Sequence, residues 1–165
     1  MKLNIMTIIP ILGLLLMLNG GFMLACLPVS LYYGDGQWHA LAISGCSVFL
    51  FGLLINYLFR GEKKENLNKR DGYFIVTTGW LCMSFSGALP YIISGEISNF
   101  SNAFFETMSG YTTTGASILT DIEAMSPGIL VWRSLTQWIG GMGIIVLTVA
   151  ILPLLGIGGM QLFVA

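Results

Sequence analysis

A run of consecutive threonines followed by a glycine holds the residues best placed to do chemistry. Thr112, Thr113 and Thr114 precede Gly115. Each threonine offers a backbone carbonyl and a hydroxyl oxygen, and β-branched residues favour extended backbone. Glycine permits backbone angles that other residues avoid, so that successive carbonyls can point in the same direction. Oxygens arranged in this way replace the water around a dehydrating potassium ion, which makes the segment a candidate ion filter.

A short apolar stretch with helical spacing precedes the threonines. It covers residues 99–109, and Ser98 or Asn99 can cap the helix that it predicts. About ten residues give a helix of roughly 15 Å, half the thickness of the hydrocarbon core of a bilayer. Gly110 is expected to end this helix, whose C-terminal end brings partial negative charge toward the threonines. We therefore predict a re-entrant half-helix followed by a filter at 110–117.

Several residues near this filter have two interpretations. Tyr111 is either part of the filter wall or an aromatic brace. Glu106 either holds the filter through Arg133 or lies near the outer surface. Small residues in the next apolar stretch permit close helix packing, or mark a place where that helix bends or passes close behind the filter. These small residues are Gly140, Gly141 and Gly143.

The composition indicates a membrane protein. Of its 165 residues, 55% are hydrophobic and 9% are charged, whereas a soluble domain carries about 25% charged residues. Seven basic and eight acidic residues nearly cancel, so nucleic-acid binding is not expected. Cys26, Cys46 and Cys82 lie far apart in apolar stretches, and His39 is the only histidine. We therefore expect an all-α integral membrane protein that is not an enzyme.

Four stretches are long enough to cross a bilayer, which takes about 20 residues. They are 5–31 (interrupted at residues 19–21 and at Pro28), 38–59, 73–94 and 128–155. The polar loop 60–72 holds most of the basic residues, so the positive-inside rule places this loop and the N-terminus in the cytoplasm. The segment between the third and fourth spans then lies outside, where its acidic residues attract cations. The predicted organisation is a helix pair (1–59), a pore unit (73–155) and a cytoplasmic start of a next segment (156–165).

Two segments resemble the TrkH family of bacterial potassium-uptake proteins. Residues 103–117 (AFFETMSGYTTTGAS) are similar to the first pore loop of that family, and residues 132–143 (WRSLTQWIGGMG) to the start of the helix after it. The resemblance implies a potassium-channel-like unit of outer helix, pore helix, filter and inner helix, which the family repeats four times after an extra helix pair. It implies a potassium site at Thr112, Thr113, Thr114 and Gly115, with Gly110 and Tyr111 adjoining.

The same resemblance implies a function and a set of partners. We expect potassium uptake across the bacterial inner membrane, with potassium as substrate and no cofactor; the family includes transporters described as coupled to protons or sodium. Expected partners are three further pore units of the same polypeptide, a second copy in a homodimer, a cytosolic nucleotide-binding subunit of the TrkA type, and membrane lipid. One loop cannot encircle an ion, so we expect the N-terminal portion of a longer protein that does not conduct alone. The alternative is a small membrane scaffold or assembly subunit with no ion pathway.

Overall fold

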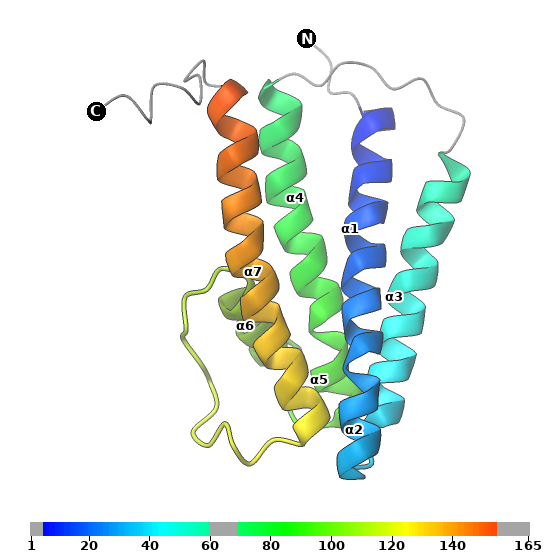
Figure 1. Ribbon diagram of the computed structural model, residues 1–165, viewed down its shortest axis with the longest axis vertical. Coiled ribbons are helices and arrows are strands. Elements are labelled where there is room, and N and C mark those ends of the chain that lie inside the picture. The colour runs from blue at the N-terminus through cyan, green and yellow to red at the C-terminus, as the bar shows by residue number, and fades with distance from the viewer. Residues whose placement is uncertain (1–4, 60–68, 155–165) are drawn as a thin grey trace.

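The computed structural model describes residues 5–59 and 69–154, and in these residues the chain is helical apart from turns and one long irregular segment (Figure 1). The helices are α1 (Ile5–Ala25), α2 (Leu27–Tyr33), α3 (Trp38–Leu58), α4 (Lys69–Gly87), α5 (Leu89–Ser94), α6 (Phe100–Tyr111) and α7 (Pro127–Leu154). The all-α class expected from the sequence is therefore confirmed. The predicted segment 156–165 and most of the predicted loop 60–72 lie outside the described residues.

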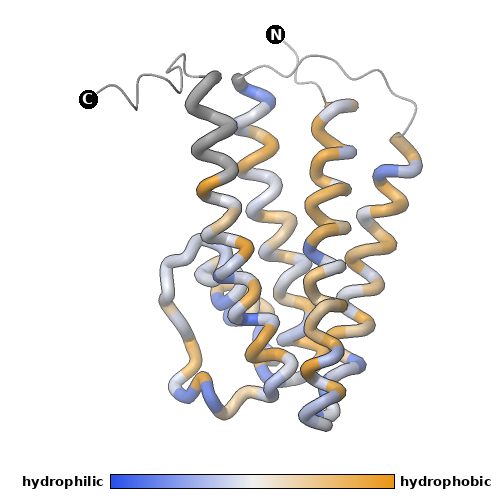
Figure 2. The backbone as a smooth tube through the Cα atoms, viewed as in Figure 1, coloured by the Kyte–Doolittle hydropathy of each residue, from blue (hydrophilic) through white to orange (hydrophobic). Residues whose placement is uncertain are grey.

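Within the described residues, three helical stretches are long and apolar enough to cross a membrane: Ile5–Tyr33, Trp38–Leu58 and Arg70–Ser94. The hydrophobic colouring along α1 and α3 in Figure 2 follows two of them. Helix α7 has 28 residues, a length of about 42 Å, which exceeds the roughly 30 Å of bilayer hydrocarbon. It covers the fourth predicted span, 128–155, except for the final residue, which is not described.

Apolar side chains lie both inside the helix bundle and on its outer surface. The buried cluster includes Met23, Leu41, Tyr91, Ile129 and Trp132. Large apolar side chains also stay exposed along the long helices, among them Leu14, Leu18, Leu50, Phe51 and Leu54. So many exposed large apolar side chains along long helices are expected where the helices face lipid.

Helices α1 and α3 pack closely because glycines face each other. A Cβ atom added to Gly20 would lie 2.6 Å from the backbone nitrogen of Phe49. A Cβ atom added to Gly52 would lie 2.6 Å from the backbone oxygen of Gly13. Small residues at such positions let membrane helices approach until their backbones touch. The first two long helices therefore form a tightly packed pair.

The interruption expected at residues 19–21 is absent, since α1 continues through them. Gly20 serves the contact with α3 and does not break the helix. The chain instead departs from regular helix at Cys26, where α2 begins with Pro28 in its first turn. Proline lacks an N–H and is tolerated at the start of a helix, so the second expected interruption is found just before it.

The third predicted span, 73–94, is two helices and not one. Helix α4 begins at Lys69, inside the polar loop predicted at 60–72. Helix α5 follows with Pro90 in its first turn. The proline ring crowds a carbonyl of the preceding turn and lacks an N–H donor, which accounts for the interruption of regular helix there.

One carboxylate ties the turn between α2 and α3 to the start of α7. Asp35 accepts a hydrogen bond from the backbone N–H of Gly128 at 2.8 Å. It also accepts from the backbone N–H of Gln37 at 2.9 Å and from the Ser30 hydroxyl. The first N–H groups of a helix have no partner within it, and negative charge is favoured beside them. Asp35 therefore attaches the N-terminal helix pair to α7.

We expect this attachment to weaken in acid. Burial raises the pKa of the Asp35 carboxyl, but hydrogen bonds from Ser30, Gly128 and Gln37 outweigh burial, so its pKa lies below the ordinary value of 3.8. A carboxyl whose pKa is lowered by folding stabilises the protein above that ordinary value, and the contribution is lost as the pH falls through the lowered pKa. The melting temperature of the detergent-solubilised protein should therefore fall as the pH drops below the ordinary value of 3.8 and through the lowered pKa of Asp35. In Asp35→Asn the melting temperature should fall less steeply with decreasing pH. The same dependence of melting temperature on pH in both proteins would contradict the expectation.

Candidate ion-binding loop

Helix α6 leads into the Thr/Gly segment. Asn99 caps its start, because the side-chain oxygen accepts hydrogen bonds from the backbone N–H groups of Ser101 at 2.9 Å and Asn102 at 3.3 Å. The helix has 12 residues, a length of about 18 Å, and it packs against α4 and α7. Its position corresponds to the half-helix predicted at 99–109, and its place within a membrane stays a prediction.

Gly110 does not end the helix, contrary to expectation. Helix α6 continues through Tyr111. A Cβ atom added to Gly110 would lie 3.1 Å from Cβ of Thr136 on α7 and closer still to the Thr136 hydroxyl. The glycine is there because α6 and α7 touch at this point, a contact that local sequence does not reveal.

The threonines that follow form a helix cap before the chain leaves α6. Thr113 has φ +54°, in the left-handed region that β-branched residues rarely adopt. The N–H of Thr113 donates to the carbonyl of Gly110, and the N–H of Thr114 donates to the carbonyl of Ser109, both at 3.0 Å. These two bonds are a Schellman motif, with Thr113 at the position that glycine usually occupies. The expectation of extended backbone is therefore wrong at Thr113.

After the cap the chain runs back along α6. Gly115 has φ +76°, and residues 112–116 are all exposed. The Ser109 hydroxyl donates to the carbonyl of Ala116 at 2.5 Å, which holds the returning segment beside the helix. The hydroxyl oxygens of Thr112 and Thr114 lie 2.8 Å apart. The structure thus places Thr112, Thr113, Thr114 and Gly115 on one exposed loop at the C-terminal end of α6, whereas the predicted adjoining residues Gly110 and Tyr111 are buried within α6.

Glu106 anchors this loop from behind. Its side chain is 1% exposed, and one carboxylate oxygen lies 2.7 Å from Nε of Arg133 on α7. The carboxylate also accepts from the Ser117 hydroxyl at 3.0 Å and from the backbone N–H of Ile118 at 3.1 Å. The contact with Arg133 is therefore confirmed and the alternative of a surface position is wrong. One buried ion pair joins α6, α7 and the end of the loop.

Tyr111 is a brace, since its side chain points away from the exposed loop. The side chain is buried, and its hydroxyl donates to the side-chain oxygen of Asn19 on α1. The ring packs at a tilt against Trp80, with centroids 6.2 Å apart. Sequence reasoning missed Asn19 as a partner, although a lone asparagine within an apolar span is a signal of a buried polar contact.

Gly140 is where α7 passes behind the start of the loop. A Cβ atom added to it would lie 2.8 Å from Cα of Tyr111 and even closer to the Tyr111 carbonyl. A Cβ atom on the neighbouring Gly141 would find its nearest contact, Cγ2 of Thr113, at 3.9 Å. At Gly140 the structure shows the close helix packing of the first interpretation, between α7 and the end of α6, and passage behind an ion filter stays a prediction.

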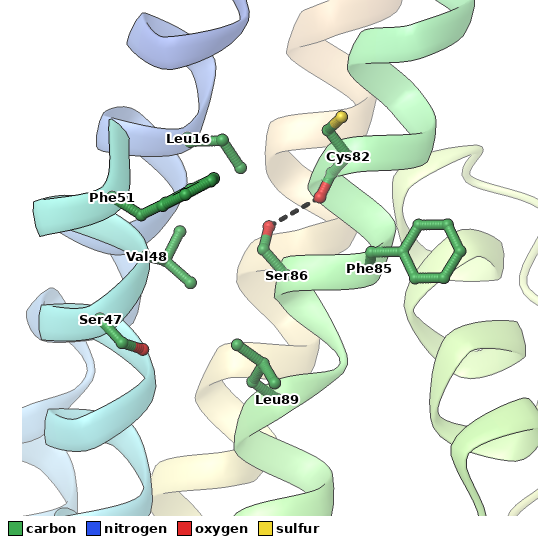
Figure 3. A pocket seen from close by; sticks show the side chains of 8 residues that line it. All are labelled: Leu16, Ser47, Val48, Phe51, Cys82, Phe85, Ser86 and Leu89. Carbon is green, nitrogen blue, oxygen red and sulfur yellow. Dashed lines mark hydrogen bonds between the residues drawn. The ribbon is translucent and has the colours of Figure 1, made fainter. Parts of the chain in front are cut away.

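The described residues also line an apolar crevice of about 470 Å³ between α3 and the α4–α5 segment (Figure 3). Val48 and Phe51 come from α3, and Cys82 and Ser86 from α4. The Ser86 hydroxyl donates to the carbonyl of Cys82 at 2.9 Å. The crevice walls offer few oxygen atoms. The threonine loop, which has several, is therefore the better candidate for coordinating a cation.

Comparison with known proteins gives consistent matches. The TrkH family, described as cation transport proteins, matches residues 39–164. The Trk system potassium uptake protein TrkH of Escherichia coli strain K12 is 44% identical over 154 residues, which are 93% of this chain and 32% of that protein. The protein of the same name from Halomonas elongata is 41% identical over 158 residues, which are 94% of this chain and 32% of that protein.

A solved structure agrees with these matches. The crystal structure of the potassium transporter TrkH from Vibrio parahaemolyticus superimposes with a TM-score of 0.85 at 40% sequence identity. The match covers 95% of this chain and 34% of that one. The chain thus spans about a third of the length of the relatives that it matches. With three helices able to cross a membrane and this agreement in sequence and fold, the chain belongs to the TrkH family of membrane transport proteins for cations, which are not enzymes.

Proposed function

We propose that this chain supplies one loop of a potassium filter in a transporter of the bacterial inner membrane. The observation that carries the proposal is the exposed loop 112–116, which α6 holds at both ends inside an otherwise apolar helical framework. The relatives are named potassium uptake proteins of the Trk system. Their agreement with this chain argues against a scaffold without an ion pathway.

The backbone of the loop suits potassium coordination. Irregular backbone at membrane depth is tolerated only where it is buried in protein or lines a water-filled path. Thr113 and Gly115 have left-handed backbone on either side of Thr114, which helps to turn successive carbonyls toward the same side. A potassium ion that loses its water meets these carbonyl oxygens instead. The C-terminal end of α6 adds partial negative charge beside them.

The ion would be selected by several such loops acting together. Since the relatives are about three times as long as this chain, we propose that three further units of one polypeptide complete the filter around the ion. The loop would face the outside, with the N-terminus and the loop 60–72 in the cytoplasm. A homodimer and a TrkA-type regulatory subunit would complete the system.

Gly115→Ala tests the filter assignment in the complete transporter. Nothing lies within 4 Å of a Cβ atom at Gly115, so the substitution acts through backbone strain at φ +76° and not through a clash. Left-handed backbone costs a non-glycine residue about 1–2 kcal/mol, so we expect potassium-over-sodium selectivity to fall about tenfold. Selectivity is measured as the ratio of potassium to sodium uptake.

Gly95→Ala is the matched control. Gly95 has φ +80°, has nothing within 4 Å of its Cβ position, and caps the C-terminal end of α5, outside the loop 112–116. The two variants carry similar strain, but only Gly115→Ala should change selectivity. The same selectivity in both variants would count decisively against a filter at Gly115.

A further inference from the structure

A buried hydrogen-bond cluster joins the first transmembrane helix to the end of α6. Asn19, in α1, is fully buried. Its amide group donates to the Ser86 hydroxyl at 2.8 Å and to the carbonyl of Met83 at 3.2 Å, both on α4. Its side-chain oxygen accepts from the Tyr111 hydroxyl. The Ser86 hydroxyl in turn donates to the carbonyl of Cys82, as Figure 3 shows. Each donor in the cluster therefore has an acceptor.

The position of Tyr111 makes this cluster important for the loop. Tyr111 is the last residue of α6 and directly precedes Thr112. Besides its contact with Trp80, its ring lies so near Gly87 that an added Cβ atom there would be 3.2 Å from it. The Tyr111 backbone lies against Gly140 on the other side. Tyr111 is therefore held at both its hydroxyl and its carbonyl, and the backbone of the loop starts from this fixed point.

The other end of the cluster is equally well fixed. Gly20, the neighbour of Asn19, packs directly against the backbone of Phe49 on α3. Asparagine is an unfavourable residue in the middle of an apolar span unless its polar atoms are paired. If position 19 only packed α1 against its neighbours, an apolar residue there would do so equally well. The pairing of Asn19 with α4 and α6 together points to a task beyond holding α1 in the bundle.

We propose that Asn19 is a positioning residue for the ion filter and that the N-terminal helix pair takes part in ion selection through it. By holding the Tyr111 hydroxyl, Asn19 keeps the first carbonyls of the loop at the spacing that favours potassium over the smaller sodium ion. The inference rests on the proposed function of the loop. It adds a structural link, 92 residues apart in the sequence, from a helix outside the pore unit to the filter.

The test uses Tyr111→Phe and Asn19→Ala in the complete transporter. Tyr111→Phe removes one hydroxyl and keeps the ring, so the helix contacts remain. The free energy of one interhelical hydrogen bond in a membrane protein corresponds to about a three- to tenfold change in an equilibrium constant. We expect a loss of potassium-over-sodium selectivity of that size in each variant. The double variant should be no less selective than Asn19→Ala alone, because Asn19→Ala already removes the bond that Tyr111→Phe removes.

Asn56→Ala is the matched control, since it removes a carboxamide from the same helix pair. Asn56 donates to the carbonyl of Gly52 in its own helix at 3.2 Å and makes a longer contact with Met17. The potassium-over-sodium selectivity of the Asn56→Ala variant should equal that of the unmodified protein. Additive losses in the double variant, or an equal loss in Asn56→Ala, would overturn the role of Asn19.

Gly115→Ala, measured in parallel, separates the two proposals. If Gly115→Ala changes selectivity while Tyr111→Phe leaves it intact, the positioning role of Asn19 is wrong and the filter assignment stands. If neither variant changes selectivity, both proposals are wrong. Tyr111→Phe retains the buried ring and should still fold. Its potassium-over-sodium selectivity can therefore be measured even if Asn19→Ala does not accumulate in the membrane.

Discussion

Glu106→Gln is expected to destabilise the protein strongly and to lower its ion selectivity. Glutamine keeps an oxygen that can accept from Ser117 and Ile118, but it leaves the charge of Arg133 without a counter-ion. Arg133 is only 12% exposed, and removing one partner of a buried ion pair costs about 3–5 kcal/mol. The loop end that Glu106 holds should then move as well. The apparent melting temperature in detergent and the potassium-to-sodium uptake ratio measure the two effects.

A second substitution shows whether the unpaired charge is the cause. Glu106→Gln combined with Arg133→Met removes both charges and keeps the acceptor for Ser117, so it should melt at a higher temperature than Glu106→Gln alone. Glu123→Gln, at an exposed acid of the same segment, should change stability by less than about 0.5 kcal/mol. A double variant as unstable as the sum of its single variants would show that the pair does not act as a unit.

Gly140→Ala is expected to disrupt the start of the loop. Its Cβ atom would lie 2.8 Å from Cα of Tyr111 and closer to the Tyr111 carbonyl, and real Cβ atoms essentially never approach other heavy atoms within 3.0 Å. The atoms in the way are backbone, so no side-chain rotation relieves the overlap and α6 or α7 must shift. Overpacking of this kind costs about 1–3 kcal/mol, and the displaced Tyr111 should also reduce selectivity.

Gly141→Ala provides the comparison one residue along the same helix. Its Cβ atom would have ordinary contact with Thr113 at 3.9 Å. Alanine is favoured over glycine in a helix by about 1 kcal/mol, so this variant should be as stable as the parent or slightly more stable. Melting temperature and ion uptake of the two variants are measured side by side. Similar behaviour of Gly140→Ala and Gly141→Ala would contradict the close passage of α7 behind Tyr111.

The local pattern of the sequence predicted the elements around the loop well. The apolar spacing of residues 99–109 and a capping asparagine indicated a short helix, and α6 is found there with Asn99 as its cap. The long apolar stretches predicted four spans, and in the part of the chain that the structure describes three helical stretches are long and apolar enough to cross a membrane. These features depend on residues close together in the chain, which is why the sequence alone reveals them.

Features that depend on contacts between distant residues were not predictable. Gly110 was expected to end a helix, yet it allows α6 to touch Thr136. Thr113 was expected to be extended, but the hydrogen bonds of the helix cap place it in left-handed backbone. The partner of Tyr111 lies 92 residues away in α1. The choice between two interpretations of Glu106 depended on how α6 and α7 cross, which periodicity does not determine.

The ion pair between Glu106 and Arg133 also constrains the order of events during synthesis. Glu106 leaves the ribosome first, and Arg133 follows 27 residues later. At the membrane depth predicted for α6, a carboxylate without its partner would be costly, so α6 would gain little by settling there while α7 is still being made. We expect α6 to enter the bundle together with α7, as one step of insertion. The charge that holds the finished loop would thus also delay its formation until the helix behind it has arrived.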